Sequence, residues 1–148
     1  MYFILRGSFF DINLSHKMTA TAKKHVYLGD LHFEHGLWLN ELAFAKDELT
    51  IFMNRLASVM EKNTDRAFEA NADSFQNRVT QQNYAVNDLR HAVKAHESEL
   101  AHYAIAHPIA IDHVHFTDHV DLRERMARFT ALYATFKKDF LHFLVQWM

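Results

Sequence analysis

The stretch LHFEHGLWLNELAFAKDELTIFMNRLASV (residues 31–59) decides the fold, because its core-type side chains recur at alternating spacings of four and three residues. This spacing places them on one face of an α-helix, where they form the seam of a packed helix. The pattern continues for about eight helical turns, which is long for a globular protein. The seam positions are Leu31, His35, Trp38, Leu42, Ala45, Leu49, Phe52, Leu56 and Val59.

The same spacing appears twice more along the chain. After the polar stretch Lys62–Asp65, whose last residue is a typical N-cap, it runs unbroken from Phe68 until Pro108 ends it. A third helix is predicted after Asp118, which we expect to be its N-cap, and it extends to Trp147. The predicted helices cover about residues 30–62, 64–106 and 118–147.

Long helices with short connections pack as antiparallel neighbours. The sequence therefore predicts an all-α fold: an elongated antiparallel (up-down-up) three-helix bundle with long coiled-coil-like helices. We expect one helical-bundle domain over residues 25–148, preceded by an irregular or flexible N-terminal extension, residues 1–24. Met18 opens an ordinary polar N-terminal sequence, so we expect residues 1–17 to come from an upstream start codon.

The composition excludes several classes of protein. The chain has no cysteine, so a disulfide framework, a thiolate metal site and a cysteine nucleophile are ruled out. With 16 basic and 18 acidic side chains, the net charge of −2 argues against nucleic-acid binding. No apolar run reaches the ~18 residues of a membrane span, and no signal peptide is recognisable, so we expect a cytoplasmic protein without membrane contact.

Enzyme motifs are missing from the sequence. There is no Gly-x-Ser-x-Gly, no phosphate-binding loop and no Gly-x-Gly-x-x-Gly. A di-iron centre of the helical-bundle type needs two Glu-x-x-His pairs, and Glu99–His102 is the single match. The sequence therefore favours a protein that is not an enzyme.

A second apolar stripe runs along residues 30–62. Leu37, Phe44 and Ile51 repeat every seven residues, offset from the main seam. Two apolar stripes on one helix indicate two packing neighbours, so this helix is either central within the monomer or part of a homodimer interface. Between the two stripes lies a row of glutamates at the same repeat: Glu34, Glu41 and Glu48.

Histidine is the outstanding residue type, with 12 in 148 residues. The antiparallel order brings the start of the first helix, the end of the second and the start of the third to one end, where most of them gather. Counting from the turn at 62–64, we expect His35 to lie level with about residue 91 and His96 about one turn beyond. Imidazole and carboxylate groups there predict a site for Zn, Fe, Ni or Cu. Its candidate ligands are His32, His35, His96, His119 and Glu99.

Three functional interpretations follow. The first is a non-enzymatic bundle that acts through protein–protein interaction or scaffolding, as a homodimer and with an unknown protein partner. The second is a metal-binding bundle that uses the histidine-rich end. In the third, buried neutral histidines sense pH, because burial disfavours their protonated form.

Overall fold

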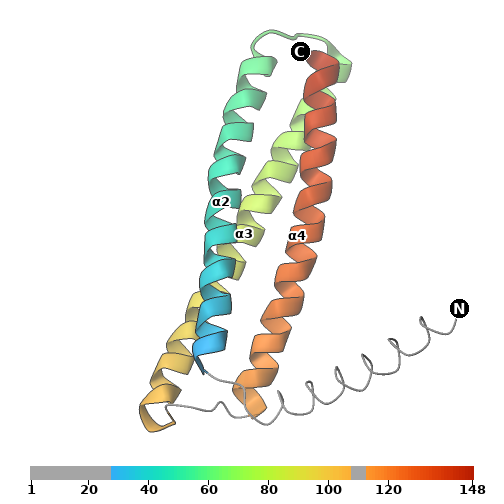
Figure 1. Cartoon of the computed structure of the whole chain (residues 1–148). Coiled ribbons are helices and arrows are strands. Elements are labelled where there is room, and N and C mark those ends of the chain that lie inside the picture. The colour runs from blue at the N-terminus through green and yellow to red at the C-terminus, as the bar shows by residue number, and fades with distance from the viewer. Residues whose placement is uncertain (1–27, 108–112) are drawn as a thin grey trace, which may run out of the picture.

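The computed structural model describes residues 28–107 and 113–148, and three α-helices follow one another there (Figure 1). The predicted all-α three-helix bundle is confirmed. The predicted extension, residues 1–24, lies outside the described residues. Within residues 28–107 and 113–148, no helix combines the length and hydrophobicity needed to cross a bilayer. The helices are α2 (Leu28–Met60), α3 (Arg66–Ala106) and α4 (His113–Trp147).

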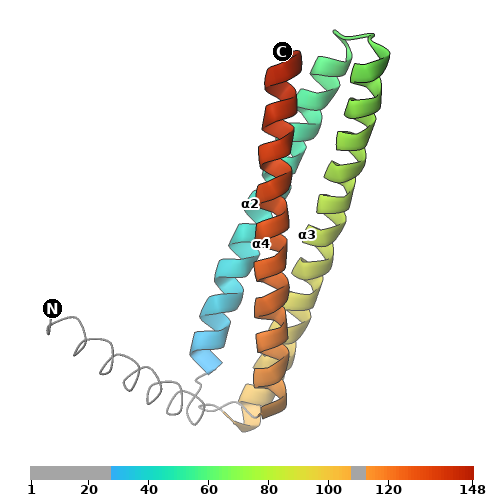
Figure 2. The same ribbon diagram turned by 90° about the vertical axis from the view of Figure 1, so that its right-hand side faces the viewer.

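The helices lie side by side in a long bundle, in which α3 runs opposite to α2 and α4 (Figures 1 and 2). With 33, 41 and 35 residues, they are about 50, 62 and 53 Å long at 1.5 Å per residue. The start of α2, the end of α3 and the start of α4 meet at the lower end in Figure 1. The turn between α2 and α3 and the end of α4 lie at the upper end.

The connection between α2 and α3 agrees with the prediction. Oδ1 of Asp65 accepts hydrogen bonds from the backbone nitrogens of Ala67 (2.7 Å) and Phe68 (3.3 Å), so Asp65 is the N-cap of α3. The helix α2 begins and ends two residues earlier than predicted, at Leu28 and Met60. The helix α3 begins two residues later than predicted, at Arg66. Differences of this size are usual at helix termini.

The start of α4 differs more. The helix begins at His113, and Asp118 is an exposed residue inside it, so the predicted N-cap is wrong. After Pro108 the sequence contains no glycine or proline, and nothing prevents the helix from extending toward its N-terminus. This additional turn brings the backbone carbonyl of His115 close to α3, where it accepts a hydrogen bond from His96.

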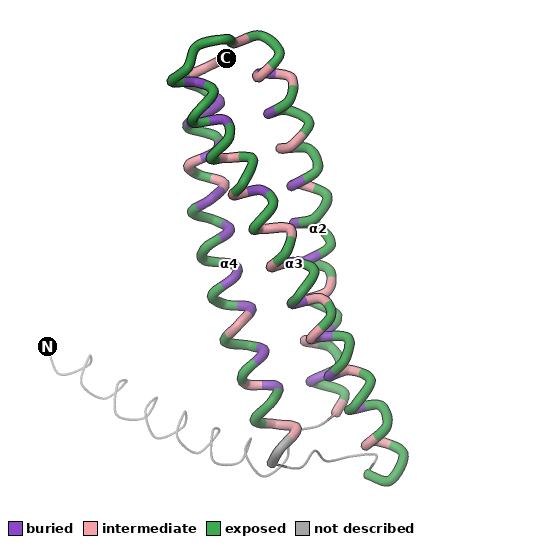
Figure 3. Tube along the Cα trace, turned by 180° about the vertical axis from the view of Figure 1, so that it is seen from behind, coloured by how far each residue is buried: buried purple, intermediate pink, exposed green. Residues whose placement is uncertain are grey.

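The core consists of the seam positions. In Figure 3, buried positions recur along one side of each helix. Aromatic rings fill the upper end, where Phe68 stacks on Phe143 at 5.7 Å between ring centroids and meets Trp147 at 5.2 Å. Close packing of this kind is the main stabilising contribution in a bundle. The largest fully buried apolar side chains are Phe68, Phe136, Phe140, Leu42, Leu49, Leu56, Val79, Val86 and Val93.

The second apolar stripe of α2 lies on the surface of the chain. Leu37, Phe44 and Ile51 are 53%, 64% and 64% exposed, and Phe33 nearby is 67% exposed. The interpretation in which this stripe packs inside the monomer is therefore wrong. The homodimer interface stays a prediction.

The glutamate row between the two stripes of α2 faces α4. Each glutamate accepts a hydrogen bond from α4 or forms an ion pair with it, which fixes this side of α2 against α4. The pairs are Glu34–Arg123, Glu41–Thr130, Glu48–Tyr133 and Glu48–Lys137.

Candidate metal centre

Each helix contributes one histidine to the core near the lower end of the bundle. His35 of α2, His96 of α3 and His119 of α4 occupy positions where the seam would otherwise hold an apolar side chain. Their exposed fractions are 1%, 5% and 0%. Long helices with three inward-facing stripes thus hold three imidazoles in a dry interior.

One nitrogen of each imidazole points to a common centre. Nε2 of His35 lies 3.1 Å from Nδ1 of His96 and 3.1 Å from Nδ1 of His119. Within the described part of the chain, these three residues form a group whose candidate ligand atoms all lie within 4.8 Å of one another. We call His35, His96 and His119 the triad.

The nitrogen–nitrogen separations suit a metal ion. At metal–nitrogen distances of about 2.0–2.1 Å, neighbouring ligand nitrogens are about 3.3–3.4 Å apart in a tetrahedral site and about 2.9 Å apart in an octahedral one. The two separations of 3.1 Å lie between these values. With the third separation within 4.8 Å, the three histidines are close enough together to hold a metal ion.

The other nitrogen of each triad imidazole faces an acceptor. Nδ1 of His35 donates to the Glu97 carboxylate, and Nε2 of His119 donates to Oε1 of Glu34 at 3.1 Å. Nε2 of His96 donates to the backbone carbonyl of His115 at 3.2 Å. When all three imidazoles are neutral, each has one N–H, and donation from the outer nitrogens leaves lone pairs on the nitrogens at the centre. Convergent lone pairs repel one another unless a cation lies between them. A histidine that binds a metal usually donates its other N–H to a carboxylate or a carbonyl, as each outer nitrogen does here.

Arg123 orients one of the two carboxylates. Its Nε and Nη2 atoms donate to the two oxygens of Glu34 at 2.7 and 3.1 Å. Burial alone would raise the pKa of Glu34, but the hydrogen bonds from Arg123 and His119 and the charge of Arg123 outweigh it and lower that pKa. The Glu34 carboxylate therefore stays ionised and remains an acceptor for His119.

Burial keeps two triad histidines in the form that binds metals. Desolvation, followed by the repulsion that a second proton would meet between His119 and His35, lowers the pKa of His119 to about 4. The same two causes, in the same order, lower the pKa of His96. Both imidazoles are therefore neutral near pH 7, where a ligand needs its lone pair.

The structure brings together three of the five residues predicted for the site. His32 is 75% exposed and lies outside the triad, where its Nδ1 contacts Glu97. Glu99 is exposed, and its charge acts on His96 without bringing its carboxylate to the centre. The carboxylates that contact the triad are those of Glu34 and Glu97.

The side chains of His35 and His96 are in contact, although the prediction sets His96 about one turn beyond the level of His35. Side chains lean toward the N-terminus of their own helix. In an antiparallel pair, a side chain of α2 and one of α3 therefore lean toward each other when the residue on α3 lies about one turn nearer the C-terminal end of its helix.

Apolar side chains close the site above and below. The ring of Trp38 stacks on that of His119, with centroids 4.9 Å apart and an interplanar angle of 25°. On the other side, one turn nearer the lower end, Leu31 and Leu100 are 2% and 4% exposed. Contacts between charges and polar groups are strengthened in such surroundings.

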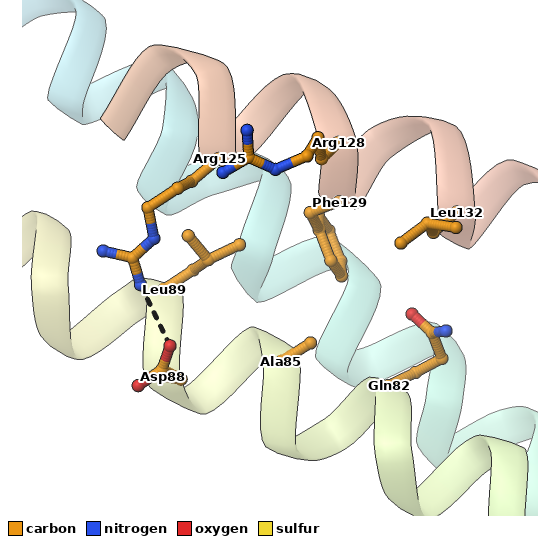
Figure 4. A pocket seen from close by; sticks show the side chains of 8 residues that line it. All are labelled: Gln82, Ala85, Asp88, Leu89, Arg125, Arg128, Phe129 and Leu132. Carbon is orange, nitrogen blue, oxygen red and sulfur yellow. Dashed lines mark hydrogen bonds and ion pairs between the residues drawn. The ribbon is translucent and has the colours of Figure 1, made fainter. Parts of the chain in front are cut away.

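A shallow groove lies between α3 and α4 (Figure 4). Its volume is about 250 Å³, and Nη2 of Arg125 donates to Oδ2 of Asp88 at 3.0 Å across it. Two guanidinium groups and one ion-paired carboxylate are unsuited to holding a metal cation. None of the three triad histidines lines this groove. It is lined by Gln82, Ala85, Asp88, Leu89, Arg125, Arg128, Phe129 and Leu132.

Comparison of the chain with known protein families, with curated proteins and with solved structures finds no match.

Proposed function

We propose that this protein is a helical bundle that binds one divalent transition-metal ion at the triad. The observation that carries the proposal is the orientation of the three imidazoles: the inner nitrogens converge, and each outer nitrogen has an acceptor. A structural histidine in a core needs one partner for each nitrogen. Among the described residues the inner nitrogens face one another, and with neutral rings an ion between them would accept their lone pairs.

The donor set defines the class of metal. Three neutral imidazoles suit Zn²⁺, Fe²⁺, Ni²⁺ and Cu²⁺, whereas Mg²⁺ and Ca²⁺ prefer oxygen ligands. The carboxylates of Glu34 and Glu97 accept from the outer nitrogens of His119 and His35 and so fix the orientation of both rings. When bound, the ion supplies positive charge at the centre and ties the three helices together at the lower end.

A metal titration tests this function. Untagged protein, purified without metal-affinity resin and treated with chelator, is titrated with Zn²⁺ by isothermal calorimetry. We expect one high-affinity ion per chain in the wild type and in the control His102→Ala, whose imidazole is exposed. We expect that ion to be lost in His119→Leu, with circular dichroism to verify helicity. Absence of binding in the wild type, or its retention in folded His119→Leu, would refute the proposal.

We propose further that the protein forms a homodimer through the exposed stripe of α2. The observation that favours this is the row of large apolar side chains, which leaves Leu37, Phe44 and Ile51 in contact with water. A second copy related by twofold symmetry would cover the stripe with the same residues. Light scattering coupled to gel filtration distinguishes a dimer from a monomer.

A further inference from the structure

A metal ion must travel from water to three histidines that solvent barely reaches. Each triad histidine is at most 5% exposed. A hydrated divalent ion therefore has to exchange its water ligands for protein ligands before it reaches them. Groups that can replace water along a route from the surface therefore indicate where the ion enters. Two carboxylates, Glu34 and Glu97, lie between the triad and solvent.

The route past Glu34 is unfavourable for a cation. The half-exposed guanidinium of Arg123 occupies both oxygens of that carboxylate. An approaching divalent ion is repelled by this charge, and it finds no free carboxylate oxygen beside it. Glu34 therefore orients His119 and does not bind an incoming ion.

The route past Glu97 consists of metal-binding groups throughout. His32 is 75% exposed, and its Nδ1 contacts Oε1 of Glu97. The Glu97 side chain is 29% exposed, and its Oε2 contacts Nδ1 of the buried His35. The two side chains that contact this carboxylate here are histidines, whereas Glu34 pairs with the guanidinium of Arg123.

We propose that His32 and Glu97 form a loading site, at which a divalent transition-metal ion binds before it moves to the triad. This inference rests on the proposed metal-binding function. An imidazole and a carboxylate on two neighbouring helices hold the ion at the surface through one nitrogen and one oxygen. The ion then passes to His35, whose ring adjoins Glu97 on one side and the triad centre on the other. His32 thus accelerates metal uptake without contributing to the final affinity.

Trp38 provides the signal needed to follow loading. Its ring stacks on that of His119, so Co²⁺ bound at the triad quenches its fluorescence. The second tryptophan, Trp147, lies at the opposite end of the bundle and is replaced by Phe in every protein tested. Chelator-treated protein is mixed with excess Co²⁺ in a stopped-flow instrument, and equilibrium titration of the same samples gives Kd.

We expect His32→Ala to load about tenfold more slowly, which is the low end of the rate increases that electrostatic steering gives. Its Kd should change by less than about twofold. His32→Asp, which replaces the imidazole nitrogen with a carboxylate oxygen as the ligand, should restore fast loading. The exposed control His102→Ala should load at the wild-type rate. If His32→Ala loads as fast as wild type while Kd is unchanged, the loading site is refuted and the triad stands. If His32→Ala weakens Kd tenfold, His32 is a ligand of the final site and the inference also fails. If wild type binds no Co²⁺, the proposed function itself fails.

Discussion

Lowering the pH of the metal-free protein should destabilise it through His119. Burial lowers the pKa of this imidazole to about 4, whereas its pKa in the unfolded chain is about 6.5. Between these two values the unfolded chain binds the proton and the folded chain does not. The contribution of His119 to the free energy of unfolding is therefore fully present above pH 6.5, and it is lost as the pH falls from 6.5 to about 4.

The size of the effect follows from the shift. A difference of about 2.5 pKa units corresponds to about 3 kcal/mol once the pH is below both values. Between pH 7.5 and 5.5 the linkage relation gives a loss of about 1.3 kcal/mol from His119 alone. In a chain of this length that lowers Tm by about 3–5 °C. His96 contributes with the same sign, because its pKa is lowered by the same causes.

Urea unfolding of chelator-treated protein at pH 7.5 and 5.5 measures this loss. In His119→Leu, which has a similar volume and no titrating group, the loss should be smaller by about 1.3 kcal/mol. The exposed control His91→Ala should behave like the wild type. Equal stability of the wild type at the two pH values would mean that the triad is hydrated, and would refute the buried geometry.

Three further predictions concern the metal, the surface stripe and a helix end. Zn²⁺ at about 1,000 times Kd should stabilise the chelator-treated protein by about 4 kcal/mol, seen as a higher Tm that EDTA reverses; an unchanged Tm would contradict metal binding. The double variant Phe44→Lys and Ile51→Lys should halve the mass measured by light scattering while circular dichroism at 222 nm stays the same, since both side chains are 64% exposed; an unaltered dimer, or a wild type that is already monomeric, would reject the interface. Asp65→Ala should cost about 1 kcal/mol in urea unfolding, because two backbone N–H groups lose their acceptor, and no loss would show that water replaces it.

The fold could be predicted because its determinants are local. The 4-3 spacing of apolar residues fixes the inward face of each helix, and residues such as Leu42, Val86 and Phe140 are fully buried as expected. The same spacing placed His35, His96 and His119 on inward faces. The three essential residues of the candidate metal centre were thus available from periodicity alone.

The rest of the centre depends on distances that periodicity does not encode. Glu97 and Glu99 are two residues apart, and the direction of each side chain decides which of them contacts His35. The sequence places Glu34 near the histidines as well as in the row of glutamates along α2, but the spacing does not show that Arg123 holds its carboxylate against His119.

X-ray absorption at the zinc K-edge tests the central claim most directly. The sample is untagged protein loaded with one Zn²⁺ per chain. The triad predicts three imidazole nitrogens at about 2.0–2.1 Å, together with the outer-shell scattering of their rings. A first shell of oxygens with one imidazole or none would contradict binding by His35, His96 and His119.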